Sequence, residues 1–302
     1  MGLPTLTLRH PGGSLGALEA TIDTRGSALR ALQVGTHSII PDYVGKKAPL
    51  YAGVVQFPWT GRIPDGSWLD GDITRVLPIT DEVTQSALHG LLATTQAQIL
   101  EQASDRVVLV LELFPSLGYP YHLSLTTTFS LDTEGVRVRN HVTNLGDVTA
   151  PFALGHHPYF ALPQSSFDGV SLRAQLTHRA LSDERDVTSG EVTVTPPLEG
   201  LDSADLRRGI DLTFRLAPSG EDTTAFALDT GEWVIEGFQD YQWPWLHVFT
   251  HSAFPSTRGD VAVIALEPHT GLPNSLNLPG SYSRVAPGET WAGEWGFKVR
   301  RT

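Results

Sequence analysis

The sequence predicts an all-β protein, a large antiparallel β-sandwich with little helix. Hydrophobic and polar residues alternate with a period of two in several segments, which indicates strands with one buried face. The 29 glycines and 21 prolines separate these segments at short intervals, as turns do in antiparallel sheets. No long segment has the 3.6-residue period of an amphipathic helix.

The clearest strand patterns lie in the first half of the chain. Residues 107–113 are almost all apolar, which is typical of a strand covered on both faces, so we place them in the middle of the sandwich. Residues 122–131 alternate between apolar and hydroxyl-bearing side chains. The turn-like residues 132–135 and a second alternating segment at 136–142 complete a predicted hairpin.

The second half of the chain gives the same kind of pattern. Residues 226–238 predict a hairpin that turns at 229–231, and the segment 188–204 predicts a surface loop. Residues 261–266 form an apolar strand that ends in Glu267. Because no repeat, low-complexity tract or linker divides the sequence, we expect all 302 residues to form a single domain.

Composition and charge exclude several classes of partner and site. With 33 acidic and 21 basic residues the formal net charge is −12, so the long-range field repels nucleic acids and anionic membrane surfaces. The absence of cysteine excludes disulfides, thiolate nucleophiles and cysteine-ligated metal centres. No apolar run approaches the ~18 residues of a membrane span. Residues 1–10 lack the layout of a signal peptide, so we expect a soluble, cytoplasmic protein.

Two basic side chains stand beside turns. Arg62 lies between a tryptophan-proline cluster and the turn-like residues 64–66, and His89 directly precedes Gly90. Both could bind a ligand. An exposed arginine on a hairpin and a structural histidine would explain the same pattern.

His156 and His157 stand in tandem before Pro158. Adjacent residues of an extended chain point to opposite sides, so the pair is not expected to chelate one metal ion, and we predict no metal site. Pro158 restrains His157 to an extended conformation. Only one of the two rings can therefore readily reach a shared pocket.

Two acidic residues stand out beside apolar segments. A carboxylate such as Glu267, at the end of a buried strand, is costly unless it has partners or a task, although a capped surface glutamate is equally possible. Asp240 precedes an aromatic segment that contains Trp243. Aromatic faces bind the C–H faces of sugars while charged groups bind the hydroxyls, but aromatic packing in a β core explains the tryptophans as well.

The order of these segments resembles the aldose 1-epimerase (galactose mutarotase) family from about Tyr51 to Phe297. The strongest matching pieces are the motif at 155–160, preceded by residues 140–144, and Glu267 with the proline that follows it. Weaker pieces surround Arg62 and His89. The family's twisted antiparallel sandwich, the galactose mutarotase-like supersandwich, agrees with the fold that the strand patterns predict.

The resemblance implies a function for each candidate residue. It makes Glu267 the general base and His157 the general acid, and it makes Arg62, His89 and Asp240 sugar-binding residues, with Trp243 as an aromatic candidate beside them. The base removes the proton of the anomeric hydroxyl and the acid protonates the ring oxygen. The ring opens, the C1–C2 bond rotates, and the aldehyde closes on its other face, with no cofactor.

Two positions depart from the family pattern and bear on substrate preference. Gly61 stands where asparagine is usual before the arginine, and His247 stands where glutamine is common. The phosphate-binding signature of related hexose-6-phosphate epimerases is not visible at 54–62, so a free hexose is the expected substrate. The expected oligomer is a monomer or a homodimer.

Two other functions remain open at this stage. A sugar-binding protein of the same fold could keep the pocket without turnover. A glycoside hydrolase or lyase on a similar sandwich would act on glycosidic or uronide linkages, and hydrolysis would need a second carboxylate beside Glu267, for which only Asp240 is a candidate.

Overall fold

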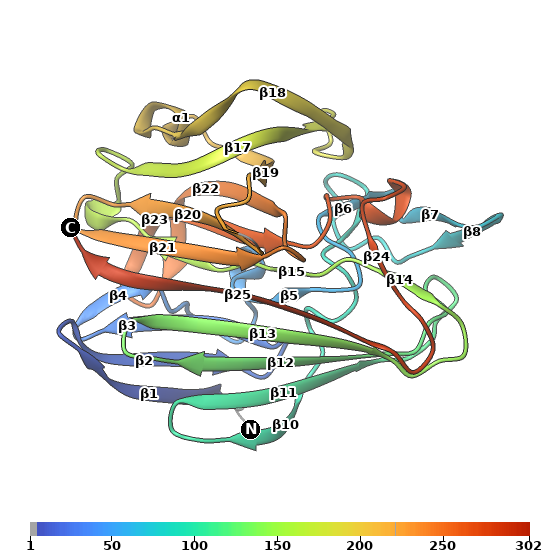
Figure 1. Cartoon of the computed structure of the whole chain (residues 1–302), viewed down its shortest axis with the longest axis horizontal. Helices are drawn as coiled ribbons and strands as arrows, with labels where there is room; N and C mark the ends of the chain where they lie inside the picture. Colours follow the sequence, from blue (N-terminus) through green and yellow to red (C-terminus); the bar gives the residue numbers. More distant parts are fainter. Residues whose placement is uncertain (1–4, 221) are drawn as a thin grey trace.

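The computed structural model describes residues 5–220 and 222–302, and the first four residues of the segment 1–10 lie outside them. Fifteen strands form one sheet. In Figure 1 its strands follow one another upward from β10 at the bottom to β17, and β18 lies beside β17 at the top. The main path of the sheet is β10 (Gln98–Gln102), β11 (Arg106–Leu113), β12 (Leu123–Leu131), β13 (Gly135–Asn144), β25 (Thr290–Arg301), β21 (Trp233–Asp240), β20 (Thr223–Asp229), β17 (Ser171–Ser182), β19 (Asp211–Leu216), β22 (Trp245–Ser256), β23 (Gly259–His269), β15 (Gly155–His156) and β5 (Val55–Gln56). Two further strands pair beside this path, β16 (Tyr159–Ala161) with β23 and β18 (Thr188–Leu201) with β17.

The remaining strands form smaller sheets. A four-stranded sheet contains β1 (Thr5–Gly13), β2 (Gly16–Asp23), β3 (Ala28–Val34) and β4 (His37–Ile40). Three two-stranded sheets pair β14 (Ala150–Phe152) with β24 (Ser283–Val285), β6 (Arg62–Pro64) with β9 (Ser86–Leu88), and β7 (Ser67–Asp70) with β8 (Ile73–Val76). Helix is limited, in the described residues, to α1 (Ser203–Arg207) and the 3₁₀ turns η1 (Pro49–Tyr51), η2 (Pro163–Ser165) and η3 (Ser275–Asn277). The predicted all-β fold is confirmed.

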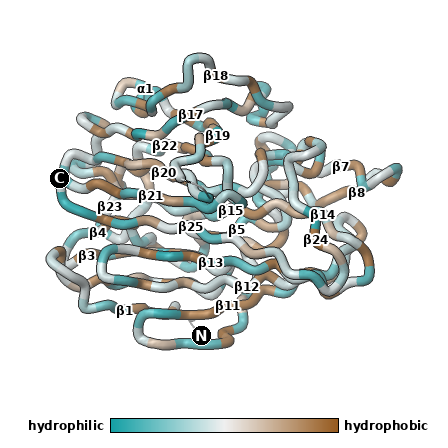
Figure 2. Tube along the Cα trace, viewed as in Figure 1, coloured by the Kyte–Doolittle hydropathy of each residue, from teal (hydrophilic) through white to brown (hydrophobic). Residues whose placement is uncertain are grey.

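The buried hydrophobic side chains form a core shared by the large sheet and the β1–β4 sheet. The main cluster extends from Leu6 on β1 to Val299 on β25. Hydrophobic and hydrophilic residues alternate along many strands in Figure 2, as expected when one face of each strand packs inward. This shared core supports our proposal that the chain is a single domain.

Both predicted hairpins are confirmed. β12 and β13 pair without a register shift, from Leu123 opposite Asn144 to Leu131 opposite Val136. β20 and β21 pair across a turn in which the backbone N–H of Thr230 donates to the carbonyl of Trp233.

Three local predictions are wrong. β11 is next to the edge strand β10, not in the middle of the sheet. An apolar run indicates that a strand is buried, but it does not indicate the position of that strand in the sheet. Residues 188–201 form β18, whose mostly exposed side chains left no alternation in the sequence, and α1 follows after the N-cap Asp202. Glu267 lies inside β23, which continues to His269.

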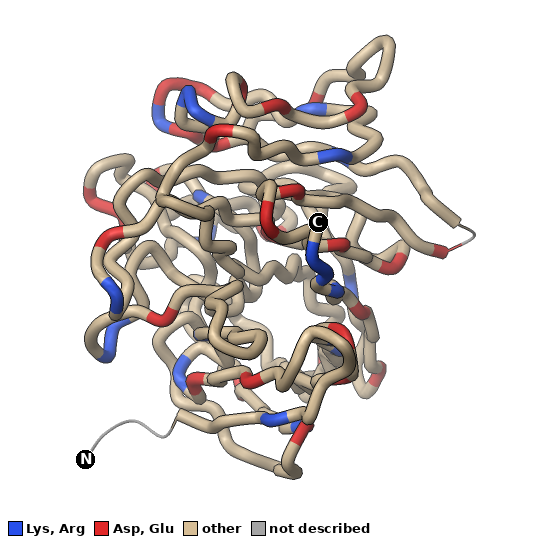
Figure 3. Tube along the Cα trace, turned by 90° about the vertical axis from the view of Figure 1, so that its left-hand side faces the viewer, with Lys and Arg blue, Asp and Glu red and all other residues tan. Residues whose placement is uncertain are grey.

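Acidic and basic residues are spread along the whole trace of the chain in Figure 3. In the described part of the chain, the search for a helix long and apolar enough to cross a membrane finds none.

Candidate active site

A cavity of about 870 Å³ opens beside strands β19, β22 and β23. Its volume falls in the range of small-molecule sites. Charged and titratable side chains converge on it from separate parts of the chain, among them Arg62, His89, His157, Asp211, His247 and Glu267.

Strand register explains how distant residues meet at this cavity. His247 on β22 lies directly opposite Glu267 on β23, and Thr213 on β19 lies directly opposite His247. Residues directly opposite each other in an antiparallel sheet project to the same face. The sheet therefore places these three side chains in one row across neighbouring strands.

Glu267 is almost fully buried, and its two carboxylate oxygens have different environments. Oε2 accepts a hydrogen bond from Gln56 Nε2 at 2.6 Å and lies 3.3 Å from His269 Nε2. Oε1 has no hydrogen-bond partner in the described part of the protein. It lies 3.3 Å from His157 Nε2 and 3.8 Å from His247 Nε2. Oε1 is therefore the oxygen available to take a proton.

The two tandem histidines lie in different surroundings, as the extended backbone predicted. His157 lines the cavity and stacks on Tyr159, whereas His156 is fully buried and packs against Trp295. Burial lowers the pKa of His156 to about 3, so its ring is neutral. Burial also lowers the pKa of His157, although the nearby Glu267 acts in the opposite direction.

His247 lies between two carboxylates. Its Nε2 is 3.1 Å from Asp211 Oδ1, and its Nδ1 is 2.8 Å from Thr213 Oγ1. Burial disfavours the charged ring, but Glu267 and Asp211 outweigh that effect and raise the pKa of His247. Burial raises the pKa of Asp211, but the hydrogen bond and charge of His247 and the charge of Arg62 outweigh it and lower that pKa.

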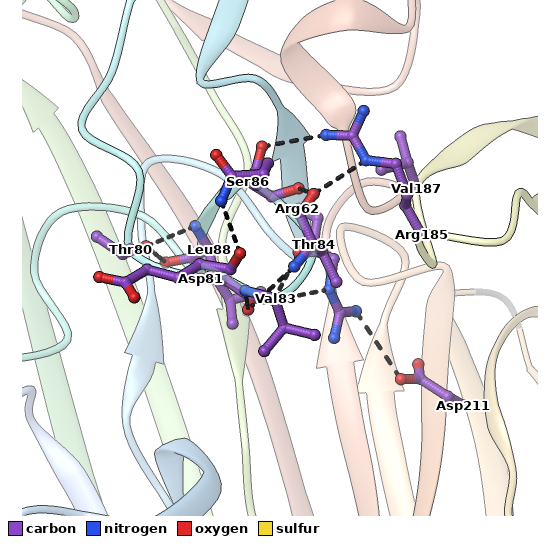
Figure 4. A network of polar contacts seen from close by, with 12 residues as sticks. Arg62, Thr80, Asp81, Val83, Thr84, Ser86, Leu88, Arg185, Val187 and Asp211 are labelled. Carbon is purple, nitrogen blue, oxygen red and sulfur yellow. Dashed lines mark hydrogen bonds and ion pairs between the residues drawn. The ribbon is translucent and has the colours of Figure 1, made fainter.

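The guanidinium of Arg62 points toward Asp211 (Figure 4). Its Nη1 lies 3.8 Å from Asp211 Oδ2, and its Nε lies 3.4 Å from Asp81 Oδ2. Asp81 also accepts hydrogen bonds from the backbone N–H of Val83 and from the hydroxyl of Thr84. This network holds the guanidinium beside Asp211, which in turn contacts His247.

His89 follows β9 in a left-handed backbone conformation with φ of 57°. Such a conformation costs of order 1 kcal/mol in a non-glycine residue and is often found at functional sites. The next residue must be Gly90, because a Cβ there would lie 2.1 Å from the carbonyl oxygen of Phe57. Burial lowers the pKa of His89 well below its ordinary value, so the ring is neutral.

The amino-acid sequence matches the sequence profile of one protein family over nearly its whole length. Residues 4–298 match the profile described as aldose 1-epimerase. The chain belongs to the aldose 1-epimerase family. One curated relative in this comparison, the uncharacterized protein YihR of Escherichia coli K12, is 36% identical over 155 residues, or 51% of this chain. That match spans about half of the relative's length, 50%.

Several solved structures share this fold over nearly the whole length of this chain and of the compared chain. The GalM/aldose epimerase homologue from C. elegans superposes with a TM-score of 0.82 at 14% identity, covering 99% of this chain and 100% of that one. A galactose mutarotase-like protein from Clostridium acetobutylicum gives 0.79 at 16% identity, covering 100% and 99%. The galactose 1-epimerase from Lactobacillus acidophilus gives 0.75 at 17% identity, covering 99% of each chain. The fold is therefore that of the galactose mutarotases.

The departure from the family pattern at Gly61 has a steric reason. The residue has a φ of 61°, and a Cβ at this position would lie 2.4 Å from Cβ of Pro273. An asparagine could adopt the backbone conformation, but its side chain would collide with the proline. Gly61 instead presents its backbone N–H to Gln56 Oε1 at 3.2 Å.

Asp240 and Trp243 do not lie in this cavity, and we correct their assignment as sugar-binding residues. Asp240 accepts hydrogen bonds from the backbone N–H groups of Gln242 and Glu294 at the end of β21. Trp243 is fully buried and packs against His156. The aromatic segment therefore has the structural role that the sequence also allowed.

Three residues of the site were missed by sequence reasoning, namely Gln56, Asp211 and His269. Asp211 is the cavity carboxylate that contacts His247, whereas Asp240 does not line the cavity. Asp211 begins a short strand and Gln56 lies in a two-residue strand, so neither had a local signal. His269 follows Glu267 by two residues in the same strand, and this period of two could have placed both side chains on one face.

Proposed function

We propose that the protein is an aldose 1-epimerase, or mutarotase, that interconverts the α and β anomers of a free hexose such as glucose or galactose. The observation that carries the proposal is the pairing of a free carboxylate oxygen, Glu267 Oε1, with an imidazole nitrogen, His157 Nε2, 3.3 Å away at the cavity. Membership of the family supports an isomerase of this type.

Glu267 is the proposed base. Its Oε2 is held by Gln56, which leaves Oε1 to accept the proton of the anomeric hydroxyl. His157 is the proposed acid and delivers a proton to the ring oxygen. Both substrate oxygens are bonded to the same anomeric carbon, so an acid and a base that lie side by side can serve them together.

The lowered pKa of His157 makes its imidazolium a stronger acid, at the cost of a smaller protonated fraction near neutral pH. When the C–O bond breaks, the hydroxyl electrons form the aldehyde and the ring oxygen becomes a hydroxyl. Rotation about C1–C2 and the reverse proton transfers close the other anomer. At the end of the cycle Glu267 and His157 have returned to their starting protonation states.

Arg62, His89 and Asp211 are the proposed sugar-binding residues. The guanidinium donates hydrogen bonds and the carboxylate accepts them. A neutral imidazole donates at one ring nitrogen and accepts at the other. Three such groups around one cavity can hold several ring hydroxyls in a fixed orientation. We further propose that the protein acts in the cytoplasm, as a monomer or a homodimer.

Polarimetry on freshly dissolved α-glucose and α-galactose tests the proposal. The expected result is a rate of optical-rotation change that rises in proportion to protein concentration, with an unchanged end point. A protein that binds either sugar without accelerating the change would be an inactive sugar-binding protein. Release of reducing sugar from a glycoside would instead indicate a hydrolase.

A further inference from the structure

A fully buried glutamine joins two parts of the site that are far apart in the sequence. The side-chain amide of Gln56 on β5 lies between Glu267 and His89. Its Nε2 donates to Glu267 Oε2 at 2.6 Å, and its Oε1 lies 2.6 Å from His89 Nδ1. The same Oε1 accepts the backbone N–H of Gly61 at 3.2 Å.

The orientation of this amide is fixed from both ends. A backbone N–H can only donate a hydrogen bond, so Gly61 requires an oxygen opposite it. An ionised carboxylate can only accept, so Glu267 requires the NH₂ group. Rotating the Gln56 amide by half a turn would break both interactions.

The fixed amide determines which nitrogen of His89 carries the proton. Gln56 Oε1 cannot donate, so His89 Nδ1 must be the N–H in their contact. A neutral imidazole has one N–H, and the other nitrogen is then a lone-pair acceptor. His89 lines the cavity, and burial keeps it neutral by lowering its pKa. Its Nε2 is therefore available to accept a hydrogen bond from a ligand hydroxyl.

The same amide restrains the carboxylate. Gln56 Nε2 and His269 Nε2 both contact Glu267 Oε2. A rotation of the carboxylate that moves Oε2 away from these two nitrogens would break both contacts. The orientation with Oε1 toward His157 is the one that keeps these two contacts.

We propose that Gln56 is a positioning residue that selects Oε1 of Glu267 as the base and sets His89 as an acceptor for a sugar hydroxyl. This inference rests on the proposed epimerase activity for its kinetic part. Its structural part, the protonation site of His89, can be measured without any activity.

The first variant is Gln56→Met, which keeps the length of the side chain and removes both polar groups. We expect kcat for mutarotation to fall by about 10²-fold, the effect of misplacing a reacting group. In long-range ¹H–¹⁵N spectra, assigned with a His89→Asn variant, wild-type His89 should be protonated at Nδ1 alone. In Gln56→Met it should become a mixture of both tautomers.

The second variant, Gln56→Glu, separates the two functions. Its carboxyl oxygen can still accept from Gly61 and His89, so the His89 tautomer should be unchanged. Two carboxylates in contact cannot both ionise easily, and the introduced carboxyl group can replace the lost donor only when it is protonated. Activity should therefore fall as pH rises, over a range where the wild type does not change. His157, His247 and His269 face Glu267 in both proteins and are a common background.

The matched control is Gln239→Met. Gln239 is also buried, but its amide donates to the backbone carbonyls of Trp243 and Trp245 outside the cavity. This variant should lose thermal stability and keep both kcat and the His89 spectrum. Wild-type kcat in folded Gln56→Met, or wild-type His89 protonated at Nε2, would overturn the inference. A wild-type protein that is inactive but has His89 protonated at Nδ1 would refute the proposed function. The kinetic role of Gln56 would be refuted with it, and the assignment of the His89 tautomer would stand.

Discussion

Replacing Glu267 by glutamine is the most direct perturbation of the proposed chemistry, because the structure indicates how the new amide would orient. The donors Gln56 Nε2 and His269 Nε2 both lie at the Oε2 position. The amide oxygen of the variant should occupy that position. Its NH₂ group would then replace Oε1, so the cavity would gain a donor where it had a proton acceptor.

The expected loss of rate follows from the contribution of one general base. Such a group contributes ~10²–10⁴-fold, and each tenfold is worth ~1.36 kcal/mol of activation free energy. The barrier should therefore rise by roughly 2.7–5.4 kcal/mol. The melting temperature should change little, because the amide is nearly isosteric with the carboxylate, keeps both contacts at the Oε2 position, and leaves His247 paired with Asp211.

The assay is initial-rate polarimetry on fresh α-glucose and α-galactose, combined with a thermal melt. Glu236→Gln is the control, because Glu236 is an exposed residue of β21 paired with Arg300, and its rate should equal the wild-type rate. A Glu267→Gln protein that retains the wild-type rate would refute the assignment of the base. A loss of rate that accompanies a large drop in melting temperature would refute the claim that Glu267 acts chemically and not structurally.

Three further predictions test the other residues of the site. His157→Asn should lower kcat by at least ~10²-fold with little change in melting temperature. His156→Asn should lower the melting temperature and leave the rate unchanged. A loss of catalysis confined to the His156 variant would reverse the assignment of the acid. Asp211→Asn should raise KM for the hexose and Asp240→Asn should not, as measured by a coupled assay; equal KM values would remove Asp211 from the binding site. The pKa of His247 is raised from 6.5, so its contribution to stability is complete below pH 6.5 and is lost as pH rises through the folded-state pKa. The melting temperatures of wild type and His247→Gln should therefore differ most below pH 6.5 and converge as pH rises through the folded-state pKa. A difference that widens with pH would contradict the charge assigned to His247.

The strand patterns of the sequence predicted the fold because the period of a strand is a local property. The alternation in β12 and β13 was visible in the sequence, and the structure pairs these two strands as a hairpin. β18 was missed because most of its side chains are exposed and do not alternate. The rank of β11 in the sheet was misjudged because burial can come from any covering layer.

The site was predictable only where short motifs carried the family resemblance. Glu267, His157, Arg62 and His89 all line the cavity, and each belongs to such a motif. Asp240 was a candidate because it precedes an aromatic segment and because the resemblance pointed to it, whereas Asp211 had no local signal. That segment packs into the core, so composition alone could not separate a sugar-binding surface from a buried one.

The sequence by itself determined the fold class, the hairpins and the family to which the chain belongs, since each depends on patterns within short segments. The tertiary structure decided which carboxylate contacts His247 beside Glu267, which oxygen of Glu267 lacks a hydrogen bond, and which atom of the Gln56 amide faces His89. These depend on the register of β19 against β22 and of β22 against β23, and on a hydrogen bond from Gln56 that crosses 211 positions of the chain. Strand register and amide orientation are settled by contacts between segments, and no local period in the sequence encodes them.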